Sequence, residues 1–310
     1  MPYRTLLAVV VILLSRASAQ LGPTVTGLLY NSDTRELRPV VGIPGSAFIG
    51  AAVATEVDAA WPAPSGKFSI VRRGDQTVLL TGFDRPDLVV IEDTRLLKNP
   101  SLVVWSIDAG TAVLYSSTTQ QLQRIHLKGS AVDIDPAFEG SHLGSTLSGL
   151  VVHSDGRIAI AFDRSQIYIA RTDEGVVNFT SVEGVVALGF ETSGEHLYVM
   201  TDSSLKTVNK SGGPTPQTLV DGLANPVGMA VRPDGIYIAT SGDNKIRRFN
   251  RKGQVEFEQN LDRKPDGLSL LQGDAVLLLN NAAGRNPAVT VDTRNQPFVF
   301  FIPNSAGSSL

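Results

Sequence analysis

The chain has 310 residues, of which 42% are hydrophobic and 18% are charged, a balance that is typical of a folded globular protein and excludes a disordered one. A formal net charge of −3 gives no reason to expect a nucleic acid or an anionic membrane as partner. Cysteine is absent, which excludes disulfides and thiolate metal sites.

The first residues have the pattern of a cleavable signal peptide. Arg4 supplies a positive charge, Leu6 to Leu14 is apolar, and Ala17-Ser18-Ala19 fits a small-residue cleavage site. A retained membrane helix would need about 20 apolar residues, so no stable membrane span is expected. We therefore expect residues 1–19 to be removed after Ala19, leaving residues 20–310 as one secreted or periplasmic domain with 25 basic and 30 acidic residues. An exported chain without cysteine is typical of bacteria.

Short apolar runs separated by turns predict β-strands along the rest of the chain. Val25 to Tyr30 and Glu36 to Val41 form a first pair around the turn at Asn31-Ser32-Asp33. Six longer units follow, each with an apolar strand, a turn that ends in glycine and a second apolar strand. Their turn glycines are Gly66, Gly110, Gly156, Gly194, Gly235 and Gly273.

The spacing of these glycines predicts the architecture. They recur every 38 to 46 residues, with room for about four strands in each repeat, which is the pattern of β-propeller blades. The longest irregular insertion is expected at Gly129 to Thr146. Ala288 to Asp292 and Pro297 to Ile302 read as final strands that share one blade with the N-terminal strands and close the ring. We expect an all-β, monomeric, six-bladed propeller with four-stranded antiparallel blades, or seven blades if the N-terminal strands form their own.

One unit resembles a known repeat. Asn225-Pro226, Gly228, Ala230, Asp234-Gly235 and Ala239 match the opening of the NHL repeat, and Asp243 to Phe249 match its continuation loosely. The stretch from Thr26 to Gly45 also resembles the start of secreted propellers of acidobacteria. These resemblances imply an NHL-like propeller over about residues 55 to 303 and leave the activity open.

Asp and Asn residues follow the second strand of most units, and they are the strongest candidates for a binding site. In a propeller these positions share one face, where we expect them around the central channel. Carboxylate and amide oxygens suit Ca²⁺, and the resemblance to gluconolactonase and regucalcin-like propellers implies an axial metal that could activate water for lactone opening. The alternative is that they cap their own turns. The candidates are Asp75, Asp163, Asp202, Asp243, Asn280 and Asn281.

The remaining polar residues suggest no catalytic group. His153 and His196 are expected as surface residues of the glycine turns, which argues against chemistry of the streptogramin-lyase kind, where a His and a Glu act together near the channel. Trp61 and Trp105 are expected in the packing between blades. The basic run from Lys245 to Lys252 is expected at a solvated blade edge.

The sequence therefore predicts an exported propeller that acts as a non-enzymatic platform for a protein or glycan at one face, with no required cofactor. The alternative function is a calcium-dependent lactonase or related hydrolase of the gluconolactonase type. Catalytic residues stay unassigned.

Overall fold

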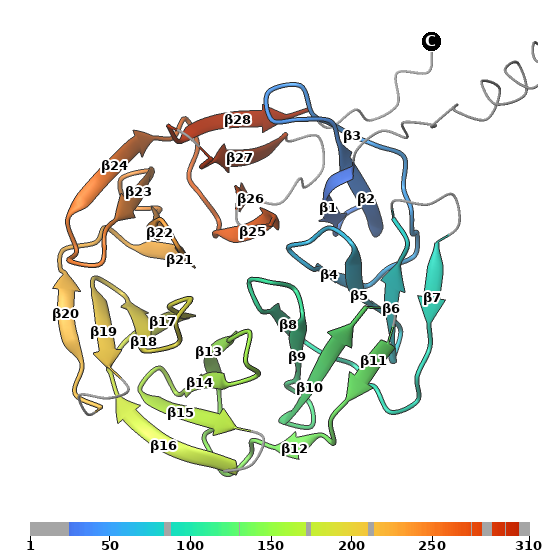
Figure 1. Cartoon of the computed structure of the whole chain (residues 1–310), viewed down its shortest axis with the longest axis horizontal. Helices are drawn as coiled ribbons and strands as arrows, with labels where there is room; N and C mark the ends of the chain where they lie inside the picture. The colour runs from blue at the N-terminus through green and yellow to red at the C-terminus, as the bar shows by residue number, and fades with distance from the viewer. Residues whose placement is uncertain are drawn as a thin grey trace, which may run out of the picture.

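The computed structural model describes residues 25–83, 88–129, 131–171, 175–209, 214–273, 275–280, 287–294 and 296–303. The predicted signal peptide and Asn281 lie outside these residues. The described part folds into seven antiparallel sheets arranged around one axis (Figure 1). It contains no helix, and so none that is long and apolar enough to cross a membrane.

Each sheet is one blade, and we number the blades 1 to 7 in chain order. The strands are, blade by blade, β1 (Val25–Asn31), β2 (Glu36–Val41), β3 (Phe48–Ile49); β4 (Ala59–Pro62), β5 (Phe68–Arg73), β6 (Gln76–Thr81), β7 (Val89–Ile91); β8 (Leu102–Trp105), β9 (Thr111–Ser116), β10 (Gln121–Lys128), β11 (Ala131–Ile134), β12 (Phe138–Glu139); β13 (Leu147–Val152), β14 (Ile158–Phe162), β15 (Gln166–Arg171), β16 (Gly175–Ser181); β17 (Val185–Phe190), β18 (His196–Thr201), β19 (Leu205–Asn209), β20 (Gln217–Val220); β21 (Pro226–Arg232), β22 (Gly235–Thr240), β23 (Lys245–Phe249), β24 (Val255–Asn260); β25 (Ser269–Gln272), β26 (Val276–Asn280), β27 (Ala288–Asp292) and β28 (Phe298–Ile302).

Antiparallel order gives the ring two distinct faces. The turns between first and second strands lie on one face, which we call the glycine-turn face. The turns between second and third strands and the linkers between blades lie on the other, which we call the linker face. Five of the six predicted turn glycines have positive φ, between 49° and 153°. The exception is Gly110, because its neighbour Ala109 takes the left-handed conformation instead, at φ 57°.

The expectation of six blades is wrong, and the seven-bladed alternative is the one observed. The N-terminal strands β1, β2 and β3 form a three-stranded blade of their own beside blade 7. The predicted closure within a shared blade is also wrong, because no described strand of blade 7 pairs with blade 1. Instead, the seam is closed by apolar packing of Leu29, Val40 and Ile49 against Leu271 and Phe300.

The expected irregular insertion turns out to complete blade 3. Its residues form β11 and β12, which both pair with β10 (Figure 1). Pairing satisfies backbone groups that an irregular loop would leave to water, which explains why the segment follows the sheet edge.

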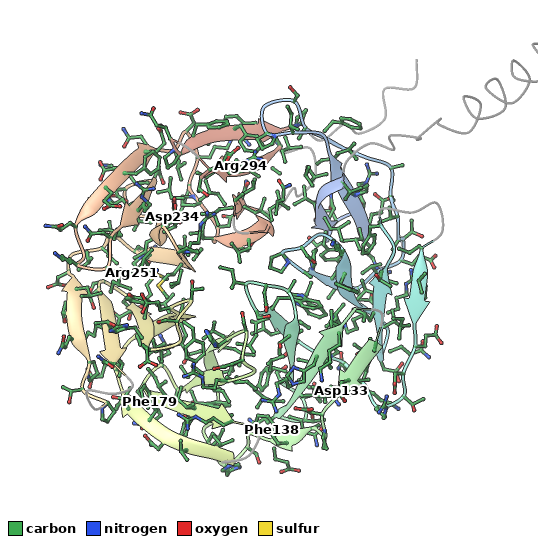
Figure 2. The ribbon with its side chains drawn as sticks, viewed as in Figure 1. Asp133, Phe138, Phe179, Asp234, Arg251 and Arg294 are labelled. Atoms are coloured by element: carbon green, nitrogen blue, oxygen red, sulfur yellow. The ribbon has the colours of Figure 1, made fainter. Side chains whose placement is uncertain are left out.

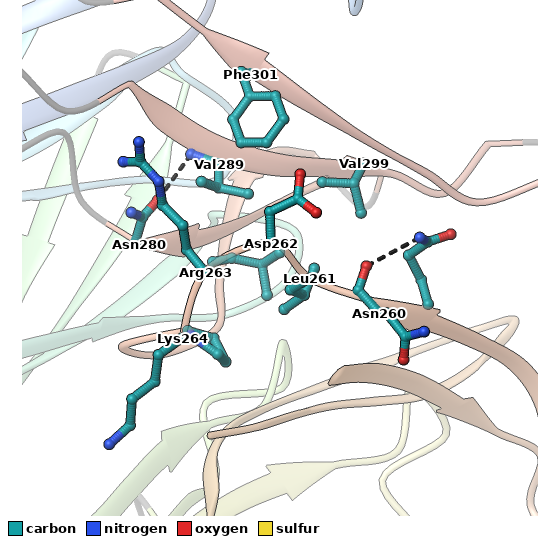
Figure 3. A pocket seen from close by; sticks show the side chains of 12 residues that line it. Asn260, Leu261, Asp262, Arg263, Lys264, Asn280, Val289, Val299 and Phe301 are labelled. Atoms are coloured by element: carbon teal, nitrogen blue, oxygen red, sulfur yellow. Dashed lines mark hydrogen bonds between the residues drawn. The ribbon is translucent and has the colours of Figure 1, made fainter. Parts of the chain in front are cut away.

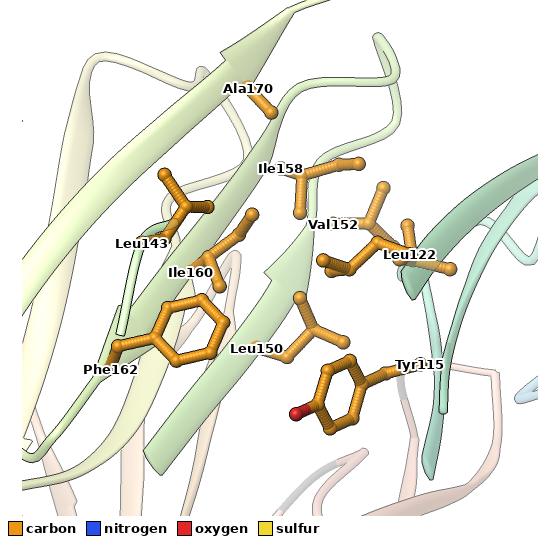
Figure 4. Packing of buried hydrophobic residues seen from close by; sticks show 10 residues of the cluster. Tyr115, Leu122, Leu143, Leu150, Val152, Ile158, Ile160, Phe162 and Ala170 are labelled. Carbon is orange, nitrogen blue, oxygen red and sulfur yellow. The ribbon is translucent and has the colours of Figure 1, made fainter. Parts of the chain in front are cut away.

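Packing between blades supplies the core. The second strand of each blade is covered on both sides, and β9, β14 and β22 are buried at every residue. Between blades 3 and 4, Tyr115 and Leu122 pack against Leu150, Ile160 and Phe162 (Figure 4). Similar apolar clusters fill the other junctions. The fold is therefore stabilised by seven interfaces rather than by one central core.

The first strands of several neighbouring blades approach too closely for any side chain. A Cβ added at Gly228 would lie 2.2 Å from the backbone nitrogen of Leu268 in the next blade. At Gly189 it would lie 2.5 Å from Cγ2 of Val231, and at Gly27 it would lie 2.8 Å from the carbonyl oxygen of Leu271. Glycine at these positions sets how tightly the ring can close.

Replacing Gly228 with alanine should therefore destabilise the protein. The new methyl group would meet backbone rather than a movable side chain, so blades 6 and 7 must separate, at a cost of about 1–3 kcal/mol. Urea unfolding measures the free-energy change. Gly267→Ala is the matched control, because a Cβ there meets nothing within 4 Å, and it should change stability by less than about 0.5 kcal/mol. Equal effects of the two variants would contradict the close approach.

Candidate functional site

The main cavity is the central channel, with a volume of 650 Å³. Residues of the first strands of all seven blades line it, and these strands surround the centre of the ring (Figure 1). The volume lies within the range of about 300–1,000 Å³ that is usual for small-molecule sites. The lining is largely apolar and includes Leu102, Trp105, Val151, Phe190 and Met229.

Polar groups in the channel come mostly from the backbone. Each first strand pairs only with the second strand of its blade, so the backbone groups of its other edge are left for the channel. Of the described residues, three with ionisable side chains belong to the lining, namely Tyr30, His153 and Glu191. The Tyr30 hydroxyl donates to the carbonyl of Val57 at 2.8 Å. The channel therefore offers hydrogen-bonding groups but little charge.

His153 and Glu191 lie at the glycine-turn mouth, in blades 4 and 5. The side chain of His153 is 11% exposed, and its Nδ1 lies 2.9 Å from a carboxylate oxygen of Asp155. Its Nε2 donates to the carbonyl of Thr192 in the next blade, at 3.1 Å. The ring also meets Phe190 edge-on, with centroids 5.6 Å apart. His153 lies in the glycine turn as expected, but its imidazole is mostly buried there, because it connects two blades.

Glu191 joins blade 5 to blade 6. Its Oε1 forms an ion pair with Nε of Arg251 at 3.0 Å, and its Oε2 lies 2.7 Å from Nδ1 of His196 and 3.0 Å from the Ser193 hydroxyl. Burial raises the pKa of Glu191, but the hydrogen bonds from His196 and Ser193 and the charge of Arg251 outweigh it, so the pKa lies below its ordinary value of 4.5. An ionised carboxylate only accepts, so Nδ1 of His196 carries the proton.

Arginine side chains connect further blades on this face. Nη1 of Arg124 in blade 3 donates to the carbonyl of Gly156 in blade 4 at 2.7 Å. Nη1 of Arg157 in blade 4 donates to the carbonyl of Gly194 in blade 5 at 3.0 Å. Both guanidiniums are largely buried, and hydrogen bonds of this charged kind are worth about 1.5–3 kcal/mol each. The carbonyls of Gly156 and Gly194 thus accept hydrogen bonds from arginines of the preceding blade, and these bonds hold this side of the rim rigidly.

The basic run after Lys245 is also paired. Arg247 contacts Asp243 and Glu258, Lys245 contacts Glu258, and Arg251 reaches Glu191 from the position labelled in Figure 2. β23 is not the blade edge itself, because β24 pairs with its outer side, and Arg251 contributes a junction that the sequence did not indicate.

The five described Asp and Asn candidates lie on the linker face, as their place after the second strands predicts. None of them belongs to the channel lining; the four Asp residues sit in turns of their own blades, and Asn280 is the last residue of β26. Asp163 accepts from the backbone nitrogens of Ser145 and Thr146 and from the Ser145 hydroxyl. Asp202 pairs with Arg164, and Asp243 with Arg247 and Thr240. Asp75 is exposed, and Asn280 accepts from the backbone nitrogen of Val289 at 2.8 Å.

The structure does not bring these residues together. Among the residues that it describes, no group of three or more His, Asp or Glu is placed to hold a metal ion. The alternative, that each residue caps its own turn, does not describe all of them either, because Asp163 accepts from the loop before β13 and Asp202 pairs with Arg164 of the preceding blade. Metal binding at Asp75, Asp163, Asp202, Asp243, Asn280 and Asn281 stays a prediction, without a geometric cluster in the described residues to support it.

A second pocket lies on the linker face between blades 6 and 7 (Figure 3). Asn280 is at its wall, Leu261, Val289 and Phe301 supply apolar surface, and Lys264 stands at the rim. Its 180 Å³ is below the usual size of a small-molecule site. The central channel is therefore the stronger candidate.

Aligning the repeats could have revealed the polar mouth. The residue three positions before the turn glycine is Ala63, Ile107, His153, Glu191, Arg232 and Leu270 in successive blades. Two consecutive blades thus carry an ionisable side chain of the channel lining here, His153 and Glu191, whereas Arg232 lies outside the lining and pairs directly with Gly235. The arginine contacts to backbone carbonyls carry no such signal, because the acceptors are not side chains.

No protein-family model and no curated protein sequence matches the chain. Several solved structures do match it. Virginiamycin B lyase from Staphylococcus aureus is 13% identical over 77% of this chain and 82% of its own, with a TM-score of 0.55. The chain is a β-propeller.

Two other solved structures, of differently named proteins, give the same result. AztD from Citrobacter koseri is 10% identical over 90% of this chain and 94% of its own, with a TM-score of 0.57. The Cps50 (Swd1) β-propeller domain of Myceliophteria thermophila is 11% identical over 80% and 86%, with a TM-score of 0.55. At these identities the likeness establishes the fold alone.

Replacing Glu191 with glutamine should weaken the junction of blades 5 and 6. At neutral pH the loss of the charge next to Arg251 should cost about 1–3 kcal/mol. A depressed carboxyl pKa contributes stability above its unfolded value that is lost as pH falls through the folded value. The gap between wild type and Glu191→Gln in urea unfolding should therefore close as pH falls below about 4.5. Glu183→Gln, at an exposed residue of the linker before β17, is the control; a gap that persists in acid would contradict the assignment.

The calcium prediction is tested at Asp163. Because this carboxylate caps the loop before β13, Asp163→Asn should lower the urea midpoint with or without Ca²⁺. Melting of the wild type in calcium and in chelator should coincide. A rise in melting temperature with calcium that is lost in Asp163→Asn would instead show that the linker face holds a metal ion.

Proposed function

We propose that this chain is an exported, non-enzymatic binding protein whose ligand docks at the glycine-turn mouth of the channel. The observation that carries the proposal is the composition of this mouth. Trp105, Ile107 and Phe190 supply apolar surface there, and His153 and Glu191 lie beside them in the same lining. Aromatic and apolar side chains beside polar ones are typical of protein recognition surfaces.

The rigidity of the rim supports recognition. His153, Glu191 and Arg157 each hold a partner in the adjacent blade, so their positions are fixed before a ligand arrives. A preorganised surface loses little entropy on binding. The proposed ligand is a protein or a glycan that approaches the loops of this face.

The NHL-like assignment and the export of the chain belong to the same proposal. The segment that resembles the NHL repeat folds as β21, β22 and β23 of one blade, in the order that the resemblance implies. Export rests on the pattern of residues 1–19. The calcium-dependent lactonase alternative has no contact in the described residues that favours it, and we do not propose it as a second function.

The test uses the full chain produced in a bacterial host and recovered from the exported fraction, with the mass of the product expected to place its N-terminus at Gln20. Immobilised protein is then offered exported proteins of the host and an array of glycans. Ser154→Arg places a long charged side chain at the channel mouth and should reduce capture at least about tenfold, as expected when a charge faces an apolar contact.

Ser117→Arg is the matched control, because Ser117 is exposed in a turn on the linker face. It should leave capture unchanged, and circular dichroism should show both variants folded. If Ser117→Arg abolishes capture and Ser154→Arg does not, the ligand docks on the linker face and the proposal is wrong.

A further inference from the structure

The central channel combines walls built mostly from apolar residues with a lack of available charge. All seven first strands contribute to its walls, and its 650 Å³ could hold one small molecule. Among the residues that the structure describes, no Lys, Arg or Asp belongs to the lining. Any molecule inside would thus meet aliphatic and aromatic side chains and the backbone edges of strands.

The ionisable groups that do line the channel are already engaged. Glu191 is neutralised by Arg251 and His196, His153 lies between Asp155 and the Thr192 carbonyl, and the Tyr30 hydroxyl is bonded to Val57. A charged ligand would find no free counter-charge in the lining. Transfer of an unpaired charge from water into such surroundings is strongly unfavourable.

A neutral ligand would face no such penalty. Hydroxyl groups at Ser148, Ser154, Thr192 and Ser269 and the unpaired edges of the first strands can bond one or two polar atoms of a ligand. The indole rings of Trp61 and Trp105 and the ring of Phe190 supply flat apolar surface.

We infer that the central channel is a binding site for an uncharged, largely apolar small molecule, such as a medium-chain alcohol or another neutral aliphatic compound. The inference extends the proposed binding role from the rim to the channel. It concerns a small ligand that binds without any macromolecular partner, so its test and the capture experiment can fail independently.

The two tryptophans make the site directly observable. Trp61 and Trp105 are the chain's only tryptophans, and both line the channel. N-phenyl-1-naphthylamine is a neutral apolar fluorophore that accepts energy from tryptophan. Bound in the channel, it should quench tryptophan emission and gain emission of its own.

Competition by three probes of equal chain length then measures whether the channel prefers a neutral or a charged ligand. 1-Decanol should displace the fluorophore, whereas decanoate and decyltrimethylammonium should bind at least about tenfold more weakly, because their charged heads lack a partner. Equal competition by all three would mean binding at an apolar surface instead, and would overturn the inference. Absence of energy transfer together with no effect of decanol on the melting temperature would also overturn it.

A variant with a charge added to the channel wall tests the site through the order in which the probes bind. This order does not depend on how tightly they bind overall. Ser269 is exposed at the start of β25 and lines the channel, so lysine is tolerated there and supplies a cation. Ser269→Lys should reverse the preference, binding decanoate more tightly than decanol. Ser117→Lys, on the linker face, should keep the wild-type order. An unchanged order in Ser269→Lys would show that the probes bind elsewhere.

Discussion

The geometry of the ring depends on how closely the first strands of neighbouring blades can approach. Gly27, Gly189 and Gly228 bring one strand directly against the next, where a methyl group would already clash. Because the sheets radiate from this inner ring, small separations at the centre become larger ones at the outer strands. The spacing at these glycines therefore governs both the packing between blades and the width of the channel.

Two kinds of junction operate around this ring. From blade 3 to blade 6, buried arginines and the His153 and Glu191 contacts connect the turns of successive blades in addition to apolar packing. Between blades 7 and 1, the junction is formed by the apolar cluster around Leu29 and Phe300. The polar side of the ring also carries the polar rim of the channel mouth, so the proposed recognition surface lies where the blades are held by directional bonds.

The sequence predicted most strands because each repeat carries its own local signals, an apolar run and a glycine that can take positive φ. Blade 1 does not follow this pattern. Its turn begins at Asn31, whose side chain accepts from the backbone nitrogens of Asp33 and Thr34, and Arg35 rather than glycine takes positive φ. Counting turn glycines therefore undercounted the blades by one. The order of the strands was enough to predict which face carries Asp163 and Asp243. Their distance from the axis depends on packing between blades, which no local pattern encodes.

Because some junctions are apolar and others contain ion pairs, their stability should respond differently to salt and temperature. Salts that are excluded from protein surfaces strengthen apolar contacts, so they should tighten the seam between blades 7 and 1. Dissolved ions also screen charges, most of all where these are partly exposed, which loosens the contact of Arg251 with Glu191. Cooling weakens apolar association and should act on the seam first. The ring can thus open either at the seam between blades 7 and 1 or at the contact of Arg251 with Glu191, and the salt concentration and temperature determine which of the two is weaker.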